Sequence, residues 1–160
     1  MEAAITDDRG AQLALPLDGV RRLFVVSADD LHGRTLMSLL AQVHPRQIID
    51  LRNFPRLDFT GITADDFRRM LLTLRTSYWK AGISLQEIES QSLRFDLNDL
   101  CSNIIQQMRD RDSNIIGPYM FFVQSSRQQN LIGPYLNSAL ATASGQQWQW
   151  QRNLPVSNNA

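Results

Sequence analysis

The chain has 160 residues, and its 16 Lys plus Arg balance 16 Asp plus Glu, so its formal net charge is zero. This length fits a single domain. Proteins that bind DNA or RNA by neutralising phosphates carry a surplus of basic residues, so the charge balance argues against direct nucleic-acid binding. Hydrophobic residues make up 43% of the chain, which is enough for a buried core, and the single Cys excludes an intramolecular disulfide framework.

The first ten residues are acidic, and nowhere does the chain contain a run of about 18 apolar residues. We therefore expect no secretory signal, no membrane partner and a cytoplasmic location. Residues 1–19 lack a helical stripe and precede the first strand signal, so they are expected to form a flexible arm. Residues 20–152 are expected to form one domain, and residues 153–160 a C-terminal tail.

The first half of the domain has the pattern of a βαβ unit. A short apolar run over residues 21–27 predicts a buried parallel strand, and a loop around residues 29–33 follows it. The next segment predicts a helix that ends before Pro45, because its apolar residues fall at i, i+3, i+4 and i+7. Residues 47–52 predict a second strand. The helical stripe consists of Leu36, Leu39, Leu40 and Val43.

Two helices are expected in the middle of the chain. Thr63 and Asp66 have the spacing of a helix N-cap and its partner, ahead of an apolar stripe. Residues 78–84 carry a poor signal for a short extended segment. Asp96 is predicted to cap the next helix, which has the clearest stripe in the chain. The first stripe comprises Phe67, Met70, Leu71 and Leu74, and the second comprises Leu97, Leu100, Cys101, Ile104, Ile105 and Met108.

Residues 119–123 predict a central strand that is buried on both faces, and residues 124–130 a loop. A helix with Pro134 near its first turn should follow, because a Pro there removes no helical hydrogen bond. Residues 146–152 alternate polar and aromatic side chains, which predicts a half-buried last strand. The order β-α-β-α-α-β-α-β indicates an α/β fold of three layers with a mostly parallel sheet. The similar hexapeptides at 115–120 and 131–136 are interpreted as chance or as paired turns.

Ligands of open α/β sheets bind at the carboxyl ends of the strands. The loops that start near residues 27, 50 and 124 end predicted strands, and their side chains could surround an anion. Asp50 is expected to orient Arg52 through a bidentate pair. The alternative is an internal salt bridge without a ligand. The candidate anion-binding residues are Asp50, Arg52, Arg56, Ser125, Ser126 and Arg127.

The segment around the second strand resembles the bacterial domain-of-unknown-function 488 family. The family's strand with Asp-Val-Arg and a nearby Phe-Pro is matched by Asp50, Arg52 and Phe54-Pro55. The resemblance covers roughly residues 22–84, and residues 119–140 weakly resemble the family's later strand, loop and helix. That family loop usually carries a Cys, often in Cys-His-Arg, but here it reads Gln124 to Arg127. The missing Cys argues against the thiol chemistry that the family implies, and against sulfur transfer as in rhodanese-like domains.

Other residues that could carry chemistry have simpler structural interpretations. Cys101 lies in an apolar helix stripe, where a buried, inert thiol is expected. His32 and His44 lack metal-ligand spacing, so no metal site is predicted. The period-two spacing of Trp148 and Trp150 favours packing over base stacking. We predict no catalytic residue and no cofactor, so the chain is expected not to be an enzyme, although this is left open.

The predicted arm contains a more specific sequence motif than the domain does. Gln12-Leu13-Ala14-Leu15-Pro16-Leu17 resembles the peptide motif that binds the bacterial DNA polymerase sliding clamp. Leu15 and Leu17 of an extended peptide could fill adjoining apolar pockets, Gln12 could make directional hydrogen bonds, and Pro16 lowers the entropy lost on binding. The alternative is that Leu13, Leu15 and Leu17 pack on the domain as an N-terminal strand. The partner-binding residues are Gln12, Leu13, Leu15, Pro16 and Leu17.

These observations predict a protein-binding regulator, or a toxin-like inhibitor with an antitoxin partner, that acts at the replisome through the sliding clamp. The alternative function is a nucleotide- or anion-binding enzyme or sensor of the 488-like family. It would use Asp50 and Arg52 together with the loop from Ser125 to Arg127.

Overall fold

The computed structural model describes residues 20–81, 94–111 and 113–151, and within them five strands form one sheet. Their order across the sheet is β3-β2-β4-β1-β5, and each neighbouring pair is parallel. The expected three-layer α/β fold is confirmed, with a wholly parallel sheet. The strands are β1 (Arg21–Ser27), β2 (Gln47–Asp50), β3 (Ser77–Lys80), β4 (Tyr119–Val123) and β5 (Trp148–Gln151).

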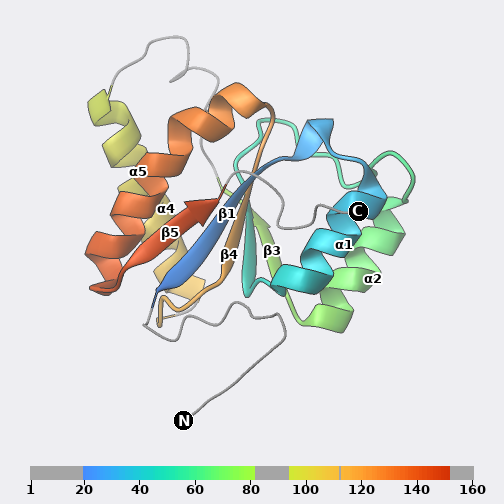
Figure 1. Cartoon of the computed structure of the whole chain (residues 1–160), viewed down its shortest axis with the longest axis horizontal. Coiled ribbons are helices and arrows are strands. Elements are labelled where there is room, and N and C mark those ends of the chain that lie inside the picture. Colours follow the sequence, from blue (N-terminus) through green and yellow to red (C-terminus); the bar gives the residue numbers. More distant parts are fainter. Residues whose placement is uncertain (1–19, 82–93, 112, 152–160) are drawn as a thin grey trace.

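The helices cover both faces of the sheet (Figure 1). α1 (Gly33–Val43) and α2 (Ala64–Leu74) lie on one face, and α4 (Arg94–Arg111) and α5 (Ser126–Ser144) lie on the other. The chain moves toward β3 through α1 and α2, and toward β5 through α4 and α5. Because crossovers between parallel strands share one hand, opposite directions place the helices on opposite faces. A single-turn 3₁₀ helix, η3 (Ala28–Asp30), follows β1.

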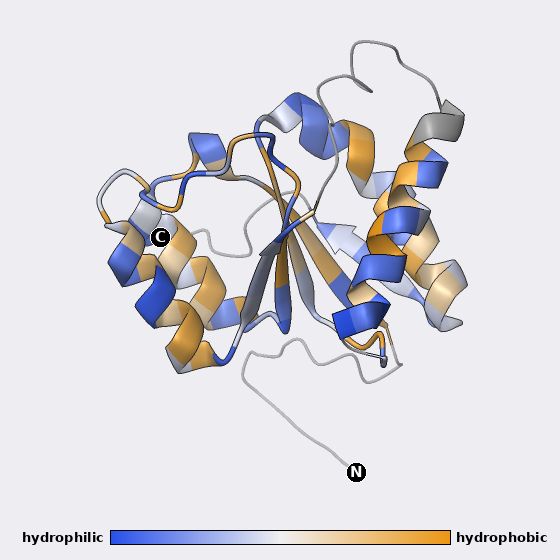
Figure 2. Ribbon diagram, turned by 180° about the vertical axis from the view of Figure 1, so that it is seen from behind, coloured by the Kyte–Doolittle hydropathy of each residue, from blue (hydrophilic) through white to orange (hydrophobic). Residues whose placement is uncertain are grey.

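The two faces of the sheet have separate apolar cores because successive side chains of a strand point in opposite directions. In β1, Leu23 and Val25 belong to the core under α4 and α5, whereas Phe24 and Val26 belong to the core under α1 and α2. Figure 2 shows hydrophobic and hydrophilic residues alternating around the helices, as expected for helices that cover a sheet on one side. All five residues of β4 are buried, which confirms its prediction as the central strand.

The start of α2 follows its sequence signal closely. Thr63 Oγ1 accepts a hydrogen bond from the backbone N–H of Asp66, and the Asp66 carboxylate accepts one from the backbone N–H of Thr63. The shorter Asp thus completes the capping box that usually contains Glu or Gln. These bonds, led by that from the Thr63 backbone, lower the pKa of Asp66 from its ordinary value.

The predicted starts of α4 and α5 are wrong. α4 begins at Arg94, so Asp96 lies within the helix instead of capping it. α5 begins at Ser126 in the expected loop, and Pro134 lies well inside this helix. An interior Pro removes one helical hydrogen bond, but Ile132, Leu136 and Leu140 on the same helix are fully buried, and this packing outweighs the loss.

The sheet has one strand more than the predicted order. Residues 77–80 form β3, which pairs with β2 at the edge of the sheet, so the weak extended signal at residues 78–84 marked a real strand with different bounds. Residues 82–84 lie outside the described part of the chain. The two similar hexapeptides are not paired turns: residues 115–120 lead into β4, while residues 131–136 lie within α5.

β5 shows the predicted alternation of burial at its first two positions, whereas Trp150 and Gln151 are both half-buried. Trp148 is buried and stacks on Tyr119 at 5.7 Å between ring centroids, while Gln149 is exposed. Across the described ranges, no helix has both the length and the apolar character needed to cross a membrane.

Candidate functional site

The carboxyl edge of the sheet contains a topological switch point, where neighbouring strands send their connections to opposite faces. β1 and β4 are neighbours, yet the chain leaves β1 toward α1 and leaves β4 toward α5. Crevices at such points are the usual ligand sites of open α/β sheets. The polar residues at this edge are therefore the first candidates for a functional site.

Asp50 and Arg52 form a buried ion pair at the end of β2. The Arg52 side chain is 1% exposed and that of Asp50 is fully buried. Arg52 donates from Nε to Asp50 Oδ1 at 2.9 Å and from Nη2 to Asp50 Oδ2 at 2.7 Å, and its backbone N–H also donates to Oδ1 at 3.1 Å. The predicted bidentate pair is present.

Three further contacts hold the guanidinium group in place. Arg52 Nη1 donates to Asp29 Oδ1 at 2.8 Å, and Nη2 donates to the backbone oxygen of Arg56 at 3.0 Å. The group lies between two aromatic rings, with its central carbon 5.8 Å from the ring centroid of Phe59 and 5.5 Å from that of Phe122. Burial by itself lowers the pKa of Arg52, but Asp50 and Asp29 outweigh it and raise the pKa above its ordinary value. The guanidinium is permanently charged and fixed in position.

Tyr78 joins the same network from β3. Its hydroxyl donates to Asp50 Oδ2 at 2.5 Å, and burial together with this bond raises the pKa of Tyr78 above its ordinary value. We call Asp29, Asp50, Arg52 and Tyr78 the carboxyl-edge network. Lys80 ends β3 beside it, and burial lowers the pKa of its amine.

A hollow of about 300 Å³ opens above Arg52, between η3 and the loop that follows β2. We call it the carboxyl-edge hollow. Arg52 contributes a buried donor to it, and Phe54, which is 84% exposed, contributes an aromatic ring. Arg56 pairs with Asp58 at 2.9 Å on the exposed side. The lining comprises Ala28, Asp29, Leu31, Arg52, Phe54, Arg56, Asp58, Phe59 and Thr60.

The structure brings together only part of the predicted anion site. Arg52 and Arg56 line the hollow, but Ser125, Ser126 and Arg127 do not, because the chain leaves β4 toward α5 on the opposite face of the sheet. Ser125 is the N-cap of α5 and accepts from the backbone N–H of Gln128. Ser126 and Arg127 are exposed in the first turn.

Sequence reasoning missed Asp29 and Tyr78 as partners of Arg52. Asp29 lies in the first candidate loop, directly after β1, so the sequence already indicated that it lies at the carboxyl edge of the sheet. Tyr78 lies on β3, and only the pairing of Ile48 with Tyr78 places its hydroxyl beside Asp50.

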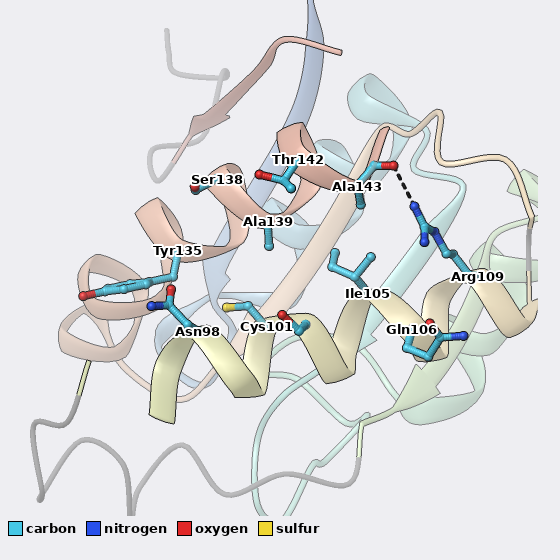
Figure 3. Close-up of a pocket in the computed structure, with 11 residues that line it drawn as sticks. Asn98, Cys101, Ile105, Gln106, Arg109, Tyr135, Ser138, Ala139, Thr142 and Ala143 are labelled. Atoms are coloured by element: carbon cyan, nitrogen blue, oxygen red, sulfur yellow. Dashed lines mark hydrogen bonds between the residues drawn. The ribbon is translucent and has the colours of Figure 1, made fainter. Parts of the chain in front are cut away.

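A larger groove of about 460 Å³ lies between α4 and α5, far from the chemistry of the carboxyl edge (Figure 3). Cys101, Ile105 and Ala139 point toward the space between the helices, and Arg109 donates to the backbone oxygen of Ala143 at 2.6 Å. No acidic residue or His lines this groove in the described chain, so its hydroxyl groups have no base beside them. We call it the helix groove.

Cys101 is buried, as expected, and burial raises the pKa of its thiol to about 12. Such a thiol stays protonated near neutral pH, which fits an inert core residue. The two histidines have structural roles: His32 accepts from the backbone N–H of Arg34 as the N-cap of α1, and the His44 ring bonds to the backbone oxygen of Leu74. Within the described ranges, no cluster of potential ligands could hold a metal ion.

No protein-family model, curated protein or solved structure matches the chain. The resemblance to the 488 family therefore stays a prediction. The candidate clamp-binding peptide, Gln12 to Leu17, lies outside the described residues, as do the predicted arm and tail.

Proposed function

We propose that the protein is a binding protein that attaches to the DNA polymerase sliding clamp through Gln12 to Leu17. The observation that carries the proposal is the hexapeptide itself, in which Gln, both pocket-filling Leu residues and the restricting Pro stand at the motif's positions. Clamp partners compete for shared pockets, so occupancy by this chain would regulate or block replication. A toxin-like inhibitor, restrained by an antitoxin partner, is one form of this function.

The described part of the chain begins shortly after the peptide. Leu17 precedes the first described residue, Val20, by three residues, which span at most about 11 Å. Val20 leads into the amino end of β1.

The decisive experiment titrates the full chain with purified sliding clamp. We expect saturable binding that the double variant Gln12→Ala with Leu15→Ala abolishes. Leu72→Ala is the matched control because Leu72 is an exposed Leu on α2, 78% accessible, outside the motif. Absence of binding, or equal affinity of the double variant, would overturn the proposal. A lower melting temperature in the double variant without any clamp binding would instead indicate that the Leu residues pack on the domain.

A second function, ligand binding at the carboxyl edge, is favoured by the hollow above Arg52. A fixed, buried guanidinium at the floor of an open hollow is a preorganised binding group. We propose that this hollow binds a small molecule, as an enzyme or a sensor of the 488-like family would. Thermal-shift measurements with Arg52→Ala are unsuitable as a test, because removing one partner leaves Asp50 as an uncompensated buried charge and destabilises the fold by about 3–5 kcal/mol.

Phe54→Ala provides the usable variant for that test, because Phe54 is exposed and its loss removes no core contact. A ligand that raises the melting temperature of the native chain but not of Phe54→Ala would support the second function. Equal stabilisation of both proteins would assign the ligand to another place.

A further inference from the structure

The carboxyl-edge hollow is balanced in charge, which restricts the ligands that it can accept. Arg52 is opposed by Asp50 and Asp29, and Arg56 by Asp58. Two carboxylates, Asp29 and Asp58, and two guanidinium groups, Arg52 and Arg56, thus line the hollow, while Asp50 binds Arg52 from outside the lining. A phosphate or a carboxylate entering the hollow would meet Asp29 and Asp58 as like charges. The geometry therefore favours a neutral ligand.

Arg52 and Asp29, which both line the hollow, nevertheless retain one unused hydrogen-bond donor and one unused acceptor. A guanidinium has five N–H groups, and the bonds of the Arg52 side chain to Asp50, Asp29 and the backbone of Arg56 use four of them. The second N–H of Nη1 meets no acceptor among the described residues, and Asp29 Oδ2 meets no donor there. Because Nη1 also binds Asp29 Oδ1, the two unused groups are neighbours.

An adjacent donor and acceptor complement a planar group that presents an acceptor next to an N–H. The Watson–Crick edge of each nucleobase presents an acceptor next to an N–H group. The exposed ring of Phe54 on the same hollow offers a stacking surface, which base recognition commonly uses. The volume of about 300 Å³ lies at the small end of ligand sites, consistent with one nucleobase.

We propose that the carboxyl-edge hollow binds a neutral nucleobase, whose edge bonds to Arg52 and Asp29 and whose face stacks on Phe54. This assignment rests on the second function proposed above and gives it a ligand class. The base is presented by a free nucleoside, since the zero net charge of the chain supplies no general attraction for a polynucleotide backbone.

The test titrates the full chain with each of the four deoxynucleosides, with inorganic phosphate and with a short single-stranded oligonucleotide. Binding is followed by calorimetry. We expect at least one nucleoside to bind, Phe54→Ala to weaken it about tenfold or more, and Leu72→Ala to leave it unchanged. Asp29→Asn should weaken it as well, because the carboxylate is the acceptor for the base. Phosphate should neither bind nor compete.

The possible outcomes separate the two proposals. If no nucleoside binds and phosphate binds more tightly to Asp29→Asn than to the native chain, ligand binding at this edge stands and the nucleobase assignment is overturned. If nothing binds, both fail. If a nucleoside binds with equal affinity to Phe54→Ala and the native chain, the assignment to this hollow is overturned. If the oligonucleotide binds tightly and nucleosides do not, the proposal that a free nucleoside presents the base is overturned.

Discussion

At the scale of single residues, Asp50 is the centre of the polar structure at the carboxyl edge. Its two oxygens accept from the Arg52 backbone, the Arg52 guanidinium and the Tyr78 hydroxyl. These donors compensate the buried negative charge of Asp50. Removing either Asp50 or Arg52 would leave the other as an uncompensated buried charge. The same bonds leave one N–H of the Arg52 guanidinium without an acceptor among the described residues.

Tyr78 allows a pH prediction at this scale. The pKa of Tyr78 is raised above 10.0 in the folded protein by burial and by the bond to Asp50. Its contribution to stability is therefore fully present below the unfolded-state pKa and is lost as pH rises through the folded-state pKa. We expect the native chain to lose more free energy of unfolding between about pH 8 and about pH 11 than Tyr78→Phe does.

Urea unfolding at both pH values measures that difference. Tyr135→Phe serves as the comparison, because Tyr135 lines the helix groove, away from Asp50. An equal loss of stability in the native chain and in Tyr78→Phe would contradict the role of the phenol.

At the scale of secondary-structure elements, α5 is held against the sheet edge at Gly133. A Cβ added at this position would lie 2.6 Å from carbon atoms of the Trp150 ring on β5. Ring atoms of a packed Trp cannot retreat as the end of a flexible side chain does. The close approach of α5 to β5 therefore depends on the absence of a side chain at this helical position.

We expect Gly133→Ala to destabilise the fold by about 1–3 kcal/mol, the usual cost of overpacking, even though Ala favours helix formation. Denaturant unfolding measures the change. Ser138→Ala on the exposed part of the same helix is the control and should be nearly neutral. A Gly133→Ala variant as stable as the native chain would show that Trp150 moves aside at no cost.

The elements differ in how well the sequence predicts them. β1, β2 and β4 carry compact apolar runs, and α2 carries both a cap and a stripe, so local signals suffice. β3 has only one buried residue in four. It forms a strand because it pairs with β2, and no local sequence pattern encodes that pairing. The first turn of α5 is polar and Pro134 lies in its interior, so the sequence signal for this helix is weak. Tertiary packing stabilises the helix nevertheless.

The candidate site shows the same division between local and long-range information. Asp50 and Arg52 are two residues apart, so their pairing is predictable from the sequence. Asp29 and Tyr78 contact them across 23 and 28 residues, and those contacts depend on strand order. The separation of Arg127 from the hollow likewise depends on which face receives α5.

At the scale of the whole molecule, the segment that carries the proposed clamp-binding peptide joins β1 at its amino end, and the carboxyl-edge hollow lies beyond its carboxyl end. Val20 enters the strand at its amino end, and Asp29 follows its carboxyl end. The seven residues of β1 span about 23 Å. A parallel sheet, buried on both faces, separates the two ends, and β1 pairs with both β4 and β5 within it.

We therefore expect the sliding clamp and a nucleoside to bind independently. Saturating the chain with one should change the affinity for the other by less than about twofold, because coupling requires an element with two arrangements that both sites bias. Clamp titrations of the full chain with and without saturating nucleoside measure the coupling, and Phe54→Ala, which should not respond to nucleoside, is the control. A large change in the clamp affinity of the native chain on adding nucleoside, absent in Phe54→Ala, would contradict this expectation. It would show that the two binding sites are energetically coupled through the sheet.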